Sequence, residues 1–256
     1  MSSAAPPGPP LSPEREGSVQ PLVRQTIRRS LYEIKTLVAQ HPGVALPIAR
    51  RRHGEPVGDD TDIVIEGFPR TGTTFAVEAF RMTQPEPVEV ACHVHAPAQL
   101  IAAAKRGIPA LALVRDPEET VLSFVIRHSH IGIGQALRGF IRFYEPLMPY
   151  RDDLVVGTFE DVTSDFGEVI RGVNKRFGTS FTEFEHTKEN ERRAFEAIDR
   201  AYSMREERGS DLEAIVARPS ELRREIKDRL RAEYRAGRLR PLRQRAERAY
   251  RSVAAS

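Results

Sequence analysis

The segment from Gly67 to Thr74 constrains this chain more than any other feature. Its sequence, Gly-Phe-Pro-Arg-Thr-Gly-Thr-Thr, follows a short apolar run and precedes a helical pattern. A strand, a glycine-rich loop and a helix in this order form a cradle for phosphate, because glycine lets the backbone approach and the first N–H groups of the helix point at the anion. Thr73 and Thr74 add hydroxyl groups, and Arg70 adds a positive charge. The segment therefore predicts a site for a nucleotide-bound phosphate.

The loop differs from the one found in nucleoside triphosphatases. Those loops end in Gly-Lys-Ser/Thr, with the lysine on the outer phosphates and the hydroxyl group on magnesium. Here Thr73 stands where that lysine is required, and no aspartate follows the apolar run 154–159 until Asp161. The pattern disfavours a P-loop phosphotransferase or kinase. That class stays an alternative, as does a non-catalytic nucleotide-binding protein.

Strand and helix patterns alternate along the chain. Short apolar runs at 62–65, 88–92, 109–114 and 154–159 predict strands. Helical spacing of apolar residues appears at 21–40, from the loop to about Met82 and at 97–106, and Pro117 suits the first turn of the next helix. Nearly everything after Thr163 is helical in pattern. We therefore expect an α/β fold: a three-layer, mostly parallel sheet of about four to five strands flanked by helices, P-loop-like, with a helical C-terminal part.

Composition sets the remaining limits. Residues 1–20 are rich in proline, serine and glycine, which predicts a disordered tail; 21–60 would be a helical segment packed on a single domain that spans 61–256. The net charge is only +3, and the C-terminal arginines are interleaved with glutamate, so we expect no nucleic-acid partner. The chain has one cysteine, no signal-peptide pattern and no apolar run of about 18 residues, which predicts a cytoplasmic protein without a membrane span. The sequence is compatible with a homodimer.

A second motif lies at the end of the third predicted strand. Arg115-Asp116-Pro117 begins the next predicted helix, and Ser123 follows about two turns later. Ligands of open parallel sheets bind at the C-terminal ends of the strands, so Arg115 would share an edge with the glycine loop. Arg115 and Ser123 could clamp a second phosphate. Alternatively, Arg115 pairs with Asp116 or Glu118 and only caps the helix.

Three elements together resemble a known family. The sequence at 69–74 resembles the 5′-phosphosulfate loop of the sulfotransferases that use 3′-phosphoadenosine 5′-phosphosulfate, and Arg115 with Ser123 resembles their 3′-phosphate motif. Phe159-Glu160-Asp161 resembles their Tyr-Glu-Asp element near the adenine. The resemblance covers roughly 62–180 and implies that 61–256 is a sulfotransferase domain. It implies donor contacts from Pro69, Arg70, Thr71, Gly72, Thr73, Thr74, Arg115, Ser123 and Phe159.

The resemblance also implies catalytic roles. Arg70 matches a position usually held by lysine and would stabilise charge on the leaving phosphate oxygen. His95, two residues before Pro97, matches the family's base, and His93 falls where a lysine often touches the sulfonate. Some branches use a carboxylate instead, and Glu89 is then the nearest candidate. The reaction requires no metal.

Several residues keep two interpretations. Cys92, His93 and His95 suggest a metal site. In a strand, however, the Cys92 side chain would lie on the opposite face from both histidines, and no fourth ligand follows at the spacing of structural zinc sites. His128 and His130 are either surface residues or part of an acceptor pocket. The Arg-Lys-Gly element of the cytosolic branch is missing, and the sequence does not identify which residue of the Arg-rich helices at 215–250 would replace it. The acceptor would be a small molecule, a carbohydrate or a lipid.

Overall fold

The computed structural model describes the backbone of residues 19–51, 55–205 and 221–255. The predicted tail, apart from Val19 and Gln20, lies outside the described residues, as does the beginning, 215–220, of the expected Arg-rich helices. The strands are β1 (Ile63–Gly67), β2 (Val90–Cys92), β3 (Ala110–Val114) and β4 (Val155–Thr158). The helices before β4 are α1 (Val19–Val38), α2 (Pro42–Ala49), α3 (Thr73–Thr83), α4 (Pro97–Arg106), α5 (Pro117–Arg127), α6 (Ile133–Tyr144) and the 3-10 helix η1 (Glu145–Asp153). Those after it are α7 (Phe159–Ser164), α8 (Phe166–Phe177), α9 (Lys188–Arg205), α11 (Glu221–Tyr234), η2 (Gly237–Leu239) and α12 (Arg240–Ala254).

The four strands form one parallel sheet in the order β2-β1-β3-β4. Every residue of β1, β2 and β3 is buried. Strands covered on both faces read as continuous apolar runs, which is why these segments were recognisable. The fold class expected from the sequence is confirmed, with four strands.

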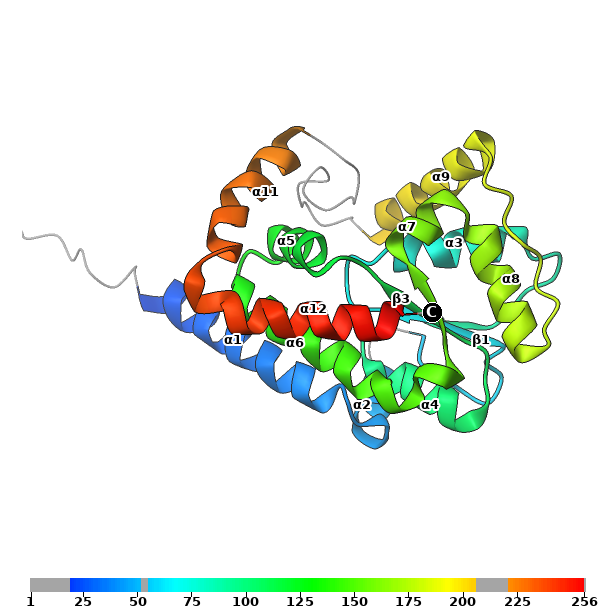
Figure 1. The fold of residues 1–256 in the computed structure, drawn as a ribbon, viewed down its shortest axis with the longest axis horizontal. Helices are drawn as coiled ribbons and strands as arrows, with labels where there is room; N and C mark the ends of the chain where they lie inside the picture. The colour runs from blue at the N-terminus through cyan, green and yellow to red at the C-terminus, as the bar shows by residue number, and fades with distance from the viewer. Residues whose placement is uncertain (1–18, 52–54, 206–220, 256) are drawn as a thin grey trace, which may run out of the picture.

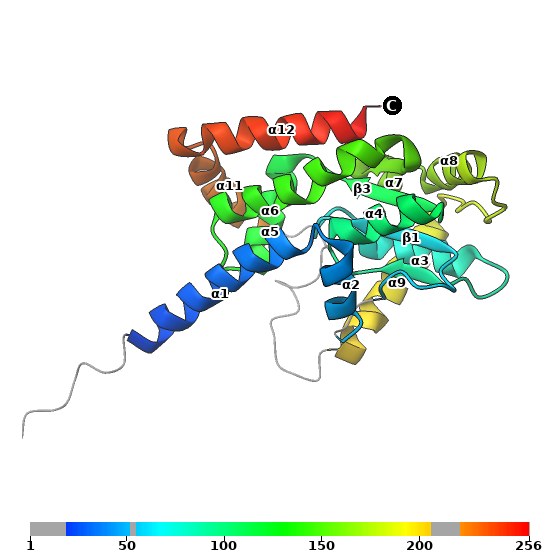
Figure 2. The same cartoon turned by 90° about the horizontal axis from the view of Figure 1, so that it is seen from below.

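Helices cover both faces of the sheet, as Figures 1 and 2 show. Alternate residues of each strand point to opposite faces. Val64, Ala112 and Val114 pack against α4, α5 and α6 in one core, whereas Ile65 and Leu113 pack against α3 and α8 in the other. The sheet is therefore the middle layer of three, and its C-terminal edge carries the loops that follow β1, β2 and β3.

The N-terminal helix α1 is fixed to α6 by ion pairs. Glu33 contacts Arg138 and Arg142 at 2.6 and 2.5 Å. Tyr32 lies against Phe124 of α5, with ring centroids 5.7 Å apart. In Figure 2 the first turns of α1 extend beyond the rest of the molecule. Helix α1 therefore packs along α6.

The sequence patterns missed two features. They gave no helix at α6, where glycine lowers helix propensity. Gly139 is needed there because a Cβ atom would come within 2.1 Å of the Tyr32 hydroxyl oxygen. Residues 179–187 form no helix, although the chain was expected to be helical almost throughout after Thr163. Phe184 of this extended segment is buried in the core beside α8 instead.

Candidate functional site

The phosphate-type loop is a rigid connection between β1 and α3. Gly72 is the residue before α3 and has φ 90°, a left-handed conformation that glycine adopts at little cost. The Thr71 hydroxyl group is buried and donates to the Phe68 carbonyl oxygen at 2.8 Å. Beneath the loop, the buried Tyr144 hydroxyl group donates to the Leu113 carbonyl oxygen at 2.7 Å and accepts from the Phe68 N–H at 3.3 Å. The loop is thereby tied to β3 and α6.

Gly67 leaves no room for a side chain. A Cβ atom there would lie 2.4 Å from the Thr71 hydroxyl oxygen and 2.7 Å from the Leu113 carbonyl oxygen. We expect Gly67→Ala to destabilise the fold by about 1–3 kcal/mol, since a packed backbone must shift to admit the methyl group. Urea denaturation measures this. Gly43→Ala is the control, because nothing lies within 4 Å of a Cβ atom at that position, and an equal loss in both variants would contradict the prediction.

Three non-glycine residues of the described chain have positive φ, and all three lie at this edge of the sheet. They are Arg70 (79°), His93 (59°) and His95 (52°). Such conformations cost free energy in residues with a Cβ atom and concentrate at functional sites. β2 ends at Cys92, and both histidines have a left-handed backbone conformation, so they do not continue the strand as the sequence suggested.

His95 is held by a buried carboxylate that the sequence analysis missed. Glu66 is fully buried on β1, and its Oε2 accepts the backbone N–H groups of Val94 and His95 at 2.9 and 3.0 Å. The Nδ1 atom of His95 lies 3.0 Å from the Gly67 carbonyl oxygen and 3.3 Å from Glu66 Oε1. Because a carbonyl oxygen only accepts, Nδ1 carries the proton and donates to Gly67. Nε2 of the neutral ring is then free to accept a proton.

The same partners change the proton affinity of His95. Burial by itself would lower the pKa of His95, but the hydrogen bond and the charge of Glu66, with the Gly67 carbonyl, outweigh it, so the pKa is raised above its ordinary value. His128 behaves in the opposite way, because burial and the charge of Arg127 lower its pKa to about 4. His128 is therefore neutral at physiological pH.

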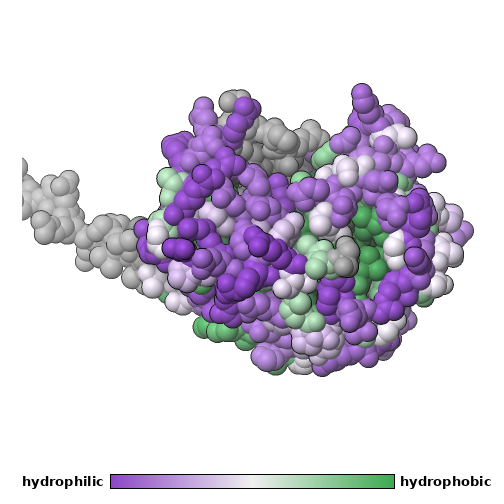
Figure 3. Space-filling model, in the orientation of Figure 1, coloured by the Kyte–Doolittle hydropathy of each residue, from purple (hydrophilic) through white to green (hydrophobic). Residues whose placement is uncertain are grey.

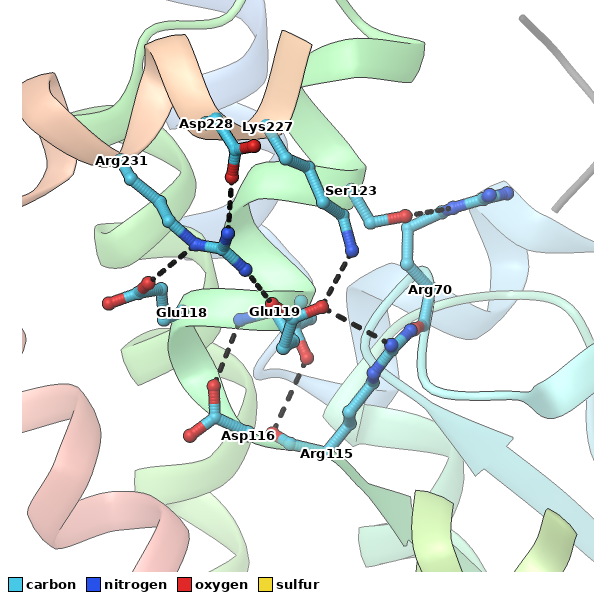
Figure 4. Close-up of polar contacts among 10 residues, drawn as sticks. Arg70, Arg115, Asp116, Glu118, Glu119, Ser123, Lys227, Asp228 and Arg231 are labelled. Atoms are coloured by element: carbon cyan, nitrogen blue, oxygen red, sulfur yellow. Dashed lines mark hydrogen bonds and ion pairs between the residues drawn. The ribbon is translucent and has the colours of Figure 1, made fainter. Parts of the chain in front are cut away.

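Arg70 and Ser123, expected from separate motifs, are in direct contact. The Arg70 Nε donates to the buried Ser123 hydroxyl oxygen at 3.1 Å (Figure 4). Arg115 lies beside them: its Nη1 donates to the Arg70 carbonyl oxygen at 3.4 Å, and its guanidinium group stacks on the Phe159 ring, 3.8 Å from the centroid. The β1, β3 and β4 motifs of the sequence therefore meet at one place.

The helix-cap alternative for Arg115 is only partly met. Asp116 caps α5 by accepting the Glu119 N–H at 2.9 Å. The partner of Arg115 is neither Asp116 nor Glu118 but Glu119, one turn on, at 3.6 Å. Arg115 remains beside Phe159 at the site.

Helix α11, in the C-terminal part of the chain, brings further cations to Glu119. Lys227 contacts Glu119 at 2.6 Å, and Arg231 contacts Glu119 and Glu118 at 2.9 and 3.2 Å. Figure 4 shows these side chains and Arg115 converging on the α5 carboxylates. Opposing charges lower the pKa of Glu119 below its ordinary value although burial works against this, so Glu119 stays ionised. No local motif announced this cluster.

One large cavity of about 1540 Å³ joins these elements. Its polar end is lined by Pro69, Arg70, Gly72, Thr73, Thr74, His93, His95, Arg115, Ser123, Phe159, Arg224, Lys227 and Arg231. Its other walls include His128, His130 and apolar residues of α1, α2, α5 and α9. The histidines at 128 and 130 thus line the cavity.

Two expected residues lie elsewhere. The Thr71 side chain turns into the loop and does not line the cavity. Glu89 is exposed just before β2, at the edge of the sheet opposite to the loop, so it is not placed to act on anything in the cavity. Glu66 is the carboxylate beside His95.

The Cys92 thiol lies away from the cavity. It is buried in the core and donates to Glu55 at 3.3 Å. Within the described residues, no group of three or more His, Cys, Asp or Glu side chains is arranged to hold a metal ion.

Comparison with protein-family models and with curated proteins gave no match. Among solved structures, the chain is similar to the crystal structure of mouse sulfotransferase SULT7A1 complexed with PAP. The two sequences are 13% identical, the match covers 75% of this chain and 90% of that chain, and the TM-score is 0.39. Because identity and TM-score are both low, the function proposed next rests on the geometry of this chain.

Proposed function

We propose that this chain is a sulfotransferase that moves a sulfuryl group from 3′-phosphoadenosine 5′-phosphosulfate to a hydroxyl or amine group of an acceptor. The observation that carries the proposal is that two groups of residues suited to bind anions line one cavity. The β1 loop with Arg70 is one, and Arg115 with Ser123 on β3 and α5 is the other. A donor with phosphate at both its 5′ and 3′ positions needs such a pair.

The donor would lie across the C-terminal edge of the sheet. Its 5′-phosphosulfate would accept N–H groups from the first turn of α3, where the helix dipole favours an anion, and the hydroxyl groups of Thr73 and Thr74. Its 3′-phosphate would contact Arg115 and Ser123. The Phe159 ring, already stacked on Arg115, offers a face for the adenine.

The α11 cluster supplies a replacement for the missing Arg-Lys-Gly element. Lys227 and Arg231 are spaced one turn apart and line the same cavity as Arg115. Glu119 holds all three cations in place. We propose Lys227 and Arg231 as the C-terminal residues that complete the 3′-phosphate site.

The transfer itself would be an in-line displacement at sulfur. The acceptor oxygen forms a bond to sulfur as the bond from sulfur to the 5′-phosphate oxygen breaks. His95 Nε2 takes the proton of the acceptor hydroxyl, and Arg70 stabilises the negative charge that grows on the departing phosphate oxygen. In the neutral ring, the hydrogen bond from Nδ1 to the Gly67 carbonyl oxygen leaves Nε2 unprotonated.

The cavity is larger than the donor requires. Ligand pockets of roughly 300–1,000 Å³ hold one drug-sized molecule, so 1540 Å³ accommodates a second. The walls away from the donor are largely apolar, with Leu31, Ile34 and Phe124 among them, and neutral His128 offers a polar group. Among the acceptor classes, this lining favours a lipid or another hydroxyl compound with an apolar body.

The phosphotransferase alternative loses support from two positions. Thr73 occupies the lysine position, and Asp161 is engaged in capping α7 through the Thr158 N–H at 3.0 Å. A non-catalytic binding protein would bind the donor without turnover. An assay of transfer from labelled donor to a series of acceptors distinguishes such a protein from an enzyme.

A thermal-shift experiment tests the donor assignment. We expect 3′-phosphoadenosine 5′-phosphate at about 100 times its Kd to raise Tm by roughly 5–10 °C, and ADP with magnesium to have no effect. Arg115→Ala should remove most of the shift, whereas Arg106→Ala, on the exposed end of α4, should keep it. A shift with ADP and magnesium alone would overturn the proposal.

A further inference from the structure

The apolar residues that the fold leaves exposed are concentrated on its N-terminal helices. Ile27, Leu31, Ile34, Leu37, Val44 and Ile48 are each exposed over 44–57% of their surface. Within the described residues, Met148 at 36% is the other large hydrophobic side chain with such exposure. Figure 3 shows a largely hydrophilic face with a hydrophobic patch at the lower left edge, below α1, and another in a hollow at the right of the view. An apolar surface of this kind marks an interaction site.

Three of these side chains on α1, together with Val38, form a stripe opposite the face that packs on the domain. Ile27, Leu31, Ile34 and Val38 follow the spacing i, i+4, i+7, i+11, which places them on one side of the helix. The opposite side carries Glu33, whose ion pairs with α6 hold the helix to the domain. The stripe is therefore not needed to attach α1.

A row of basic residues runs beside the stripe. Arg24, Arg28 and Lys35 are exposed, at i, i+4 and i+11, and the latter two each follow a stripe residue by one position. The one acidic residue of α1 is Glu33, which Arg138 and Arg142 neutralise at 2.6 and 2.5 Å. The helix thus presents apolar and positive surface together. An apolar face flanked by lysine and arginine is typical of helices that lie in an anionic lipid interface.

We propose that α1, with α2 beside it, docks on an anionic lipid surface with the stripe turned toward the acyl chains. No described helix is both long and apolar enough to cross a membrane, so the contact we propose lies in the interface plane. The stripe is continuous with the cavity, because Leu31, Ile34 and Val38 also line its wall. The docked helix therefore places the cavity next to the lipid. The docking itself does not depend on the transfer reaction.

Vesicle sedimentation of the full chain tests this inference. We expect binding to vesicles of phosphatidylcholine with phosphatidylglycerol, and much weaker binding to phosphatidylcholine alone. Ile27→Gln with Leu31→Gln should lower partitioning more than tenfold, since each side chain loses its apolar burial in the interface. Arg24→Ala should lower it about fivefold, and only on anionic vesicles. Met148→Gln, on η1, is the matched control and should bind as the wild type does.

Circular dichroism would confirm that the variants are folded, as their exposure predicts. Absence of wild-type binding to anionic vesicles would overturn the proposal, as would equal binding by the double variant. Light scattering, which measures the oligomeric state, tests whether a second copy of this chain binds the stripe instead. A dimer that the double variant converts to monomer, without vesicle binding, would assign the stripe to self-association and overturn the lipid assignment.

Discussion

Replacing His95 by alanine is expected to lower kcat/KM for sulfuryl transfer by about 10²- to 10⁴-fold, the range that a positioned general base contributes. The expectation follows from the ring geometry: Nδ1 donates to the Gly67 carbonyl oxygen at 3.0 Å, which leaves Nε2 to accept the acceptor proton. Donor binding should change little, because the proposed role of His95 concerns the acceptor. Turnover with labelled donor and calorimetry with 3′-phosphoadenosine 5′-phosphate measure the two effects separately.

His93→Ala is the matched control for this prediction. The centroids of the two rings lie 5.9 Å apart, both residues have a left-handed backbone conformation, and both line the cavity. If the His93 variant loses the larger share of activity, the base has been assigned to the wrong histidine. Near-full turnover by His95→Ala on the true acceptor would also contradict the assignment.

A pH profile tests the role of Glu66 in the same experiment. The base must be neutral, and Glu66 holds the pKa of His95 above its ordinary value, so wild-type kcat/KM should fall as the pH drops through that raised pKa. Glu66→Gln removes the negative charge and should move this acid limb to lower pH. A variant that merely loosened the fold would lower the rate without moving the limb.

The fold was predictable because its signals are local. The strands β1, β2 and β3 are short buried apolar runs, and Pro97 and Pro117 mark the first turns of α4 and α5. Helix α6 was missed for a tertiary reason: Gly139, a poor helix residue, is required by the close approach of Tyr32. Residues 179–187 were misjudged because their aromatic side chains pack in the core without a helix.

The site divides in the same way. Arg70, Arg115 and Ser123 belong to short motifs beside the strands, so their convergence followed from the parallel sheet. Glu66 carries no such signal, because a carboxylate at the end of an apolar run is normally a solvated strand terminus. Lys227 and Arg231 resemble any charged helical face until the chain returns α11 to Glu119. Such placement is set by tertiary packing, which residue spacing does not encode.

Arg70→Ala is expected to lower kcat by about 10²- to 10³-fold, the usual loss when a group that stabilises developing charge is removed. Arg70→Lys should recover much of that rate, since it keeps the charge, although it loses the hydrogen bond from Nε to Ser123. Ser123→Ala separates the two functions of this contact. If Ser123 serves the 3′-phosphate, its loss weakens donor binding more than kcat. If it mainly orients Arg70, kcat falls with little change in the Kd of 3′-phosphoadenosine 5′-phosphate. An Arg70→Ala variant that transfers at the wild-type rate would remove the charge-stabilising role from this loop, leaving it a phosphate cradle without a part in the chemical step.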